Sequence, residues 1–66
     1  MERLLTKRQR QVLELMSEGK TRRQIAWELR ISQCTVDNHI NALRNRLDAQ
    51  SGPHCVGRAY ELGILA

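Results

Sequence analysis

The chain has 66 residues and a formal net charge of +4, with 11 Lys and Arg against 7 Asp and Glu. A domain of this length buries only about 60% of its unfolded surface, which leaves no place for a catalytic pocket. Its longest apolar run is too short to span a bilayer, its N-terminus lacks a signal-peptide core, and its two cysteines make no disulfide framework, so we expect a protein of the reducing cytosol.

The first predicted helix covers about residues 7–18. Thr6 is its N-cap, Gln9 completes a capping box, and Gly19 follows its last turn. Residues 1–5 form a short arm before the cap. The expected core side consists of the apolar residues Leu5, Val12, Leu13 and Met16.

A short second helix covers about residues 22–29. Thr21 and Gln24 form another capping box at its start. Its buried face consists of Ile25, Ala26 and Leu29. Arg30 and Ile31 then make a tight turn, after which Ser32 caps the next helix.

The third predicted helix covers residues 33–47 and has two contrasting faces. Its core stripe consists of Val36, Ile40, Leu43 and Leu47. Its opposite face carries Cys34, Asn38, Asn41 and Asn45. Asparagine is a poor helix former, but its amide matches the donor and acceptor of an adenine edge in the major groove of DNA. The face therefore points to DNA reading, with a merely tolerated polar surface as the alternative.

A fourth helix is expected at about residues 53–62. Ser51 caps it, Pro53 lies in its first turn, and Gly63 ends it. Its apolar residues are Cys55, Val56, Ala59, Tyr60 and Leu62. Ile64 and Leu65 are expected to fold back onto the core. With no strand pattern, repeat or linker, the chain is predicted to be one compact all-α domain over residues 1–66.

The positive charge lies in the first three helices, since ten of the eleven Lys and Arg residues precede residue 47. Cations begin the helices at 7–18 and 22–29, whereas acids lie near their ends. The helix dipole disfavours each such placement by about 0.3–1 kcal/mol. A phosphate docked at the exposed amides would reverse that penalty. The inversion therefore favours binding to a phosphate backbone, against the alternative of chance placement.

These residues together resemble the LuxR/GerE-type helix-turn-helix family, the DNA-binding domain of many bacterial response and quorum-sensing regulators. The resemblance covers about residues 5–65, and sigma-factor region 4 shares several of its pieces. The matching motifs are Leu5-Thr6-x-Arg8, Val12-Leu13, Gly19, Ile25-Ala26, Leu29, Ile31-Ser32, Thr35-Val36-x-x-His39, Leu47, Val56-x-x-Ala59 and Gly63-Ile64.

The resemblance implies a four-helix domain in which residues 33–47 form the recognition helix. Bases are met in this family from the positions of Asp37, Asn38 and Asn41. Phosphates are met near Thr35 and His39 and at the start of the helix at 22–29. The family commonly dimerises through its last helix, and the matching positions are Cys55, Arg58, Ala59 and Leu62.

We therefore predict a cytoplasmic, nucleoid-associated transcription regulator that binds double-stranded DNA as a homodimer on a palindromic site. The expected base contacts are Gln33, Asp37, Asn38 and Asn41. The expected phosphate contacts are Lys7, Arg8, Lys20, Thr21, Arg22, Arg23, Thr35, His39 and Arg44. No enzyme activity, cofactor or metal is expected, because the carboxylates are scattered and no Cys or His pair has ligand spacing.

Several residues depart from the family pattern. The family usually has Lys where this chain has Asp37 and Arg where it has Gly52, and often Glu at Gln9 and Gln11. An acid on the DNA side repels phosphate, although it can accept a hydrogen bond from cytosine.

Asp37 therefore motivates an alternative, in which the domain mainly binds protein, such as RNA polymerase, a sigma factor or another regulator. Trp27 is expected to be exposed and could anchor such a partner, or else cover the arm around Leu4. Both a stand-alone regulator and an excised C-terminal domain fit the chain, and Met1 favours the first.

Overall fold

The computed structural model describes residues 5–65, which form four helices and no strand. The helices are α1 (Lys7–Ser17), α2 (Arg22–Leu29), α3 (Gln33–Leu47) and α4 (Gly52–Glu61). Relative to the expected ranges, α1 ends one residue earlier and α4 is shifted by one residue toward the N-terminus. The predicted all-α, four-helix class is confirmed.

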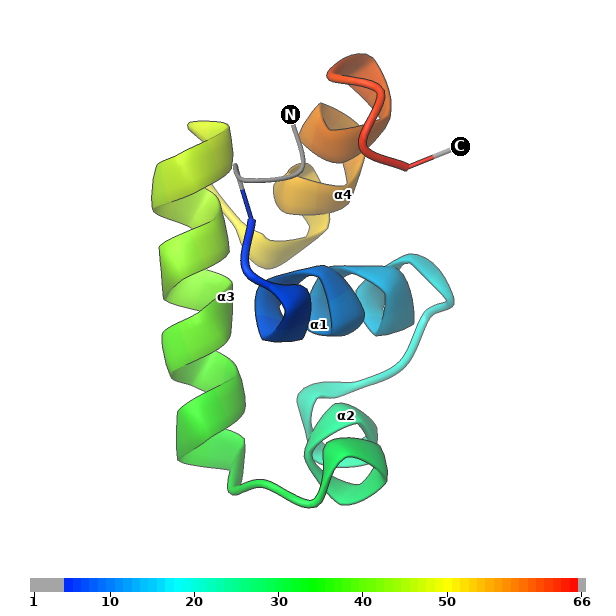
Figure 1. The fold of residues 1–66 in the computed structure, drawn as a ribbon, viewed down its shortest axis with the longest axis vertical. Coiled ribbons are helices and arrows are strands. Elements are labelled where there is room, and N and C mark those ends of the chain that lie inside the picture. The colour runs from blue at the N-terminus through cyan, green and yellow to red at the C-terminus, as the bar shows by residue number, and fades with distance from the viewer. Residues whose placement is uncertain (1–4, 66) are drawn as a thin grey trace.

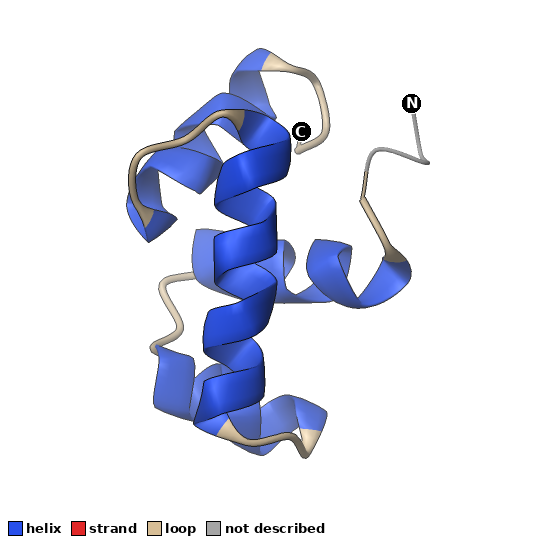
Figure 2. Ribbon diagram, turned by 90° about the vertical axis from the view of Figure 1, so that its left-hand side faces the viewer, coloured by secondary structure: helices blue, strands red, loops and turns tan. Residues whose placement is uncertain are grey.

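The longest helix, α3, is the element around which the others are arranged. In Figure 1 it stands upright, with α1 beside its middle, α2 at one end and α4 at the other. Figure 2 shows it in front of the other three helices. One side of α3 therefore packs on all three neighbours, while its other side faces outward.

The core is aliphatic, because the chain has no Phe and leaves its Trp and Tyr exposed. Val36, Leu43 and Leu47 of the predicted stripe are buried, and Ile40 is half-buried against them. The other buried apolar residues are Leu5, Val12, Leu13, Ile25, Ala26, Cys55 and Ala59. Ile64 and Leu65 pack against this core, as expected for a returning tail.

Every helix is preceded by the hydroxyl residue that the sequence predicts as its N-cap. The caps are Thr6, Thr21, Ser32 and Ser51, and each side-chain oxygen accepts a hydrogen bond from the backbone N–H three residues later. The capping boxes of α1 and α2 are complete, since the side chains of Gln9 and Gln24 accept hydrogen bonds from the cap N–H groups. Each cap satisfies one of the orphan amides of a first turn.

Two helix ends use a left-handed residue that is not glycine. Arg30 ends α2 with φ 58°, and Asp48 ends α3 with φ 54°. Such a conformation costs of order 1 kcal/mol for a residue with a Cβ, so the surrounding packing must stabilise it. At Arg30 it turns the chain sharply from α2 into α3 and so sets the geometry of the helix-turn-helix.

Candidate nucleic-acid interface

The outward face of α3 is polar and accessible. Cys34, Asn38, Asn41 and Asn45 are all exposed on it, opposite the buried stripe of the same helix, and Gln33 is exposed at its start. The Asn41 side-chain oxygen lies 3.4 Å from Nη1 of Arg44, which is a long hydrogen bond. Asn38 makes no side-chain hydrogen bond within residues 5–65, so both the oxygen and the NH2 group of its amide are open to an incoming partner.

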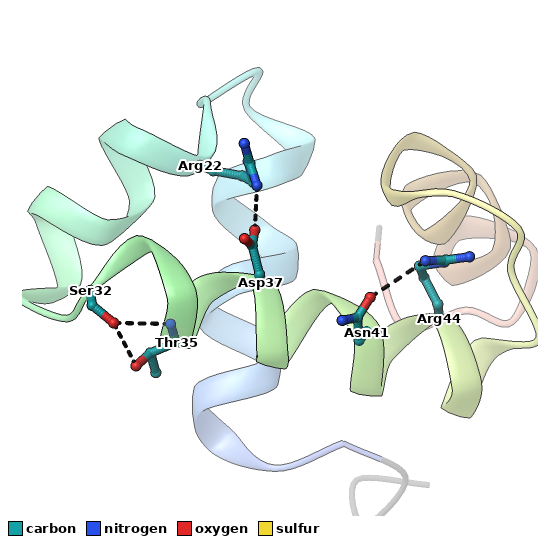
Figure 3. A network of polar contacts seen from close by, with 6 residues as sticks. All are labelled: Arg22, Ser32, Thr35, Asp37, Asn41 and Arg44. Carbon is teal, nitrogen blue, oxygen red and sulfur yellow. Dashed lines mark hydrogen bonds and ion pairs between the residues drawn. The ribbon is translucent and has the colours of Figure 1, made fainter.

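The first turn of α3 is braced by a pair of hydroxyls. Ser32 Oγ accepts a hydrogen bond from the Thr35 backbone N–H at 3.0 Å and lies 2.9 Å from Thr35 Oγ1 (Figure 3). Thr35 is half-buried, as is His39 one turn later. A ligand approaching the outward face therefore meets Thr35 and His39 only along its edge, whereas Asn38 lies fully in its path.

The start of α2 lies beside the second turn of α3 and joins it through an ion pair. Nη1 of Arg22 lies 2.7 Å from Oδ1 of Asp37, and the two side chains point toward one another (Figure 3). Their side chains are 58% and 41% exposed, so the pair belongs to the surface. Asp37 is therefore not an isolated acid on this face, because the guanidinium offsets its charge.

This pair changes how two predicted contacts are understood. Arg22 and Asp37 were assigned separately, one to phosphate and one to bases, and they lie 15 residues apart in the chain. No local periodicity connects residues on different helices, so only the packing of α2 on α3 brings them together. In the sequence, Asp37 stands out as a base-contacting position and by its departure from the family lysine, but neither signal points to Arg22.

The remaining cations that are predicted to contact phosphate differ in whether an acidic side chain is paired with them. Lys20 lies 3.4 Å from Glu28 in a surface ion pair. Within residues 5–65 the only further ion pairs are those of Arg22 and Arg58. Four predicted cations thus have no acidic partner in that part of the chain: Lys7, Arg8, Arg23 and Arg44.

These cations do not form one patch. In Figures 2 and 3, α1 begins on one flank of α3 and α2 begins on the other. Lys7 and Arg8 start α1, whereas Arg22 and Arg23 start α2. The predicted cations are therefore divided between the two flanks of the polar face, which is a feature that residue spacing did not reveal. The charge inversion itself is present, since neither helix has an acid in its first turn or a cation in its last.

The prediction of which residues form a dimer interface needs correction. Cys55 and Ala59 are fully buried between α4 and the rest of the core, so their side chains have no surface to offer a second chain. Nε of Arg58 donates to the Leu47 carbonyl oxygen at 2.9 Å, and Nη1 lies 3.0 Å from Glu61. Of the four predicted residues, Leu62 is the most exposed, at 38%. The helical pattern of α4 was apolar over a wide arc, and burial of two of these positions followed from its contact with α1 and α3.

Burial also alters the chemistry of one of these residues. Desolvation of the Cys55 thiol raises its pKa above the ordinary value of 9.0, despite the opposing charge of nearby Arg44. Cys34, by contrast, is exposed on α3. Within residues 5–65, no group of three or more His, Cys, Asp or Glu side chains is arranged to hold a metal ion.

The indole of Trp27 projects from α2 into solvent and is 82% exposed. This agrees with its place on the helical wheel, opposite Ile25. The alternative contact with Leu4 falls outside the described residues. Over the described part of the chain, no helix has the length and apolar character needed to cross a membrane.

The sequence of this chain matches known regulators over nearly its whole length. Residues 3–59 match the family described as bacterial regulatory proteins, luxR family. The spore germination protein GerE of Bacillus subtilis is 42% identical over 62 residues, which cover 94% of this chain and 84% of that protein.

Longer regulators match as well. The transcriptional regulatory protein DesR of B. subtilis is 37% identical over 89% of this chain but only 30% of its own length. The transcriptional activator protein CarR of Pectobacterium carotovorum is 38% identical over 92% of this chain and 25% of its own length. The chain thus spans most of GerE but less than a third of these two proteins.

Proposed function

Because this chain belongs to the luxR family of bacterial regulatory proteins, whose members are DNA-binding transcription regulators, we propose that it controls transcription by placing α3 in the major groove. One observation carries the proposal. The outward face of α3 is polar and open, and helices with cationic starts lie on both of its flanks.

The dimensions of duplex DNA favour this arrangement. The major groove is about 12 Å wide and admits one α-helix, and a phosphate strand borders it on each side. A helix lying in the groove therefore has a phosphate backbone along each flank. Lys7 and Arg8 of α1 would approach one strand, while Arg22 and Arg23 of α2 would approach the other. Phosphate contacts of this kind set the orientation of the recognition helix.

The exposed side-chain amides on α3 are the groups that would contact the bases. Asn38 and Asn41 can each present a donor and an acceptor to an adenine edge, and Gln33 at the start of α3 has the same chemistry. Asp37 has its second carboxylate oxygen available to accept from cytosine N4, although Arg22 already holds the first. We therefore assign the stronger share of base discrimination to the asparagines.

We further propose that the domain acts as a homodimer, with one α3 in each half of a palindromic site. The interface would be formed by the exposed side chains at the end of α4, Tyr60 and Leu62, rather than by the buried Cys55 and Ala59. These side chains are 50% and 38% exposed, and each presents apolar atoms to solvent. Symmetric pairing through one such patch is the usual way in which a two-fold dimer forms.

A second function rests on Trp27. A tryptophan that is 82% exposed is the type of side chain that anchors a protein interface. It would let the domain contact RNA polymerase, a sigma factor or another regulator while α3 is bound to DNA. The name of the relative CarR, a transcriptional activator protein, is consistent with such a contact.

The test compares three variants on selected and random duplexes over a salt series. Asn38→Ala should change the enriched sequence and cost about 1–3 kcal/mol on the preferred site, because a bidentate base contact is lost. Arg23→Ala should weaken all duplexes equally and flatten the salt slope by about 0.9. Asn45→Ala is the control, since Asn45 is exposed on α3 but is not assigned to a base.

The wild-type chain should show a steep salt slope and enrich a palindrome. Unchanged preference in Asn38→Ala would contradict the assignment of α3 to base reading. A steep slope without any enriched sequence would leave only nonspecific attraction to the backbone. Negligible DNA binding at moderate salt, together with a protein partner that Trp27→Ala abolishes, would favour the second function.

A further inference from the structure

A groove with an apolar floor lies beside the proposed DNA face. It is lined by the end of α1, the middle of α3 and the start of α4. Met16, Ile40 and Val56 supply apolar side chains that are only partly buried against the core. Its charged rim consists of Lys20, Arg22, Asp37 and Arg44.

The groove is open because residue 52 is glycine. Gly52 is not among the glycines with positive φ, so its backbone conformation does not require glycine. A Cβ at this position would lie 3.4 Å from Met16 Cε and 3.9 Å from Ile40 Cγ2, over the floor of the groove. A longer side chain at this position would therefore start over the floor, which glycine leaves uncovered.

We propose that this groove docks an acidic amphipathic segment of a partner protein. An apolar side chain of the segment would pack on Met16, Ile40 and Val56, which lose contact with water on binding. Flanking carboxylates would lie near Arg44, the rim cation that has no acidic partner within residues 5–65, and could share Lys20 with Glu28. Asp37 is already paired with Arg22 at 2.7 Å, so the acid on the rim does not oppose an anionic ligand as an isolated charge would.

The combination of an apolar floor and a cationic rim favours a protein segment over DNA as the occupant of the groove. Phosphates and sugars are held by cations, hydroxyls and backbone N–H groups. Three apolar side chains offer none of these donors, so a DNA backbone gains little from covering them. A protein segment with one apolar and several acidic residues uses both the floor and the rim.

The position of the groove has a regulatory consequence, which rests on the proposed function. Its rim includes Arg22, Asp37, Asn41 and Arg44, and the proposed DNA face uses the same residues. The segment and the duplex therefore cannot occupy the domain together. A partner bearing such a segment would release the domain from DNA by direct competition.

The experiment is a selection of random 16-residue peptides, displayed on phage, against the whole chain. The key variant is Gly52→Arg, which covers the floor. Gly57→Arg is the matched control, because Gly57 lies on the same helix and a Cβ there meets nothing within 4 Å. Arg44→Glu is a second variant, which reverses one rim charge at an exposed position and so leaves the core intact.

Enriched peptides should combine a Leu, Ile, Met or Phe with several Asp or Glu. They should bind wild type and Gly57→Arg at least tenfold more tightly than Gly52→Arg and Arg44→Glu. A duplex should displace them in proportion to its occupancy. Failure to enrich acidic peptides, or affinities that neither variant changes, would overturn the proposal.

Random-sequence duplex binding is measured separately, so that the two proposals can fail independently. Gly52→Arg should bind duplexes at least as tightly as wild type, because it adds a cation near the rim. Loss of duplex binding in Gly52→Arg, with its helical circular dichroism retained, would show that the groove holds the DNA backbone and would overturn the docking of a protein segment. A wild-type chain that binds acidic peptides but no duplex would refute only the proposed function.

Discussion

Replacing Asp37 with Asn tests how the ion pair with Arg22 acts on DNA binding. The two side chains are 58% and 41% exposed, and surface pairs of this kind contribute about 0.2–1 kcal/mol to folding. The variant should therefore remain folded with a small loss of stability. In the wild type, the carboxylate competes with phosphate for the guanidinium that it holds at 2.7 Å.

Release of Arg22 should add one phosphate contact. Each added contact steepens the slope of log affinity against log salt by about 0.9, so the advantage of the variant should grow about 3.5-fold from 200 mM to 50 mM salt. The assay is fluorescence anisotropy on a random-sequence duplex across that range. Unfolding in urea, followed by circular dichroism, gives the change in stability.

Glu61→Gln is the matched control. It removes the acid of the Arg58 pair, which has a 3.0 Å separation and lies on α4, and it raises the net charge by the same amount. Its salt slope should equal that of the wild type. An unchanged slope in Asp37→Asn would refute the idea that the carboxylate restrains Arg22. A flatter slope would show instead that Asp37 holds Arg22 in position for a phosphate.

Three further predictions concern the stability of the fold. Leu43→Ala removes a fully buried side chain and should cost about 2–5 kcal/mol in urea unfolding, whereas exposed Asn45→Ala should change it by less than about 0.5 kcal/mol. Thr21→Ala removes the acceptor of the Gln24 N–H, so α2 should lose about 1 kcal/mol, measured in the same way, and Thr21→Ser should retain most of it. Because the pKa of the Cys55 thiol is raised in the fold, the unfolded chain loses the thiol proton at a lower pH than the folded chain does. The contribution of Cys55 to the free energy of unfolding is therefore fully present below pH 9.0 and falls as pH rises through the folded-state pKa. Cys55→Ala should abolish that decline, measured by thermal unfolding at alkaline pH. A wild-type stability that is flat above pH 9.0 would contradict the last of these.

The sequence alone determined the helices, their starts and most of the core. Hydroxyl residues stand before each helix, and a capping interaction spans only three residues, so local spacing suffices to predict it. The stripe that includes Val36, Leu43 and Leu47 follows from helical periodicity, which is equally local. The motifs that resemble the LuxR/GerE family also lie in short segments, and the family assignment agrees with them.

Only the tertiary structure decided which residues on different helices meet. Arg22 reaches Asp37 because α2 packs on α3, and Cys55 and Ala59 are buried because α4 packs on α1 and α3. The left-handed turn at Arg30 has no glycine to signal it. Only the fold places residue 52 beside Met16, so that a Cβ there would lie 3.4 Å from the Met16 side chain. Periodicity specifies how side chains are distributed around a single helix, whereas contacts between helices depend on the turns and crossing angles that cooperative packing selects.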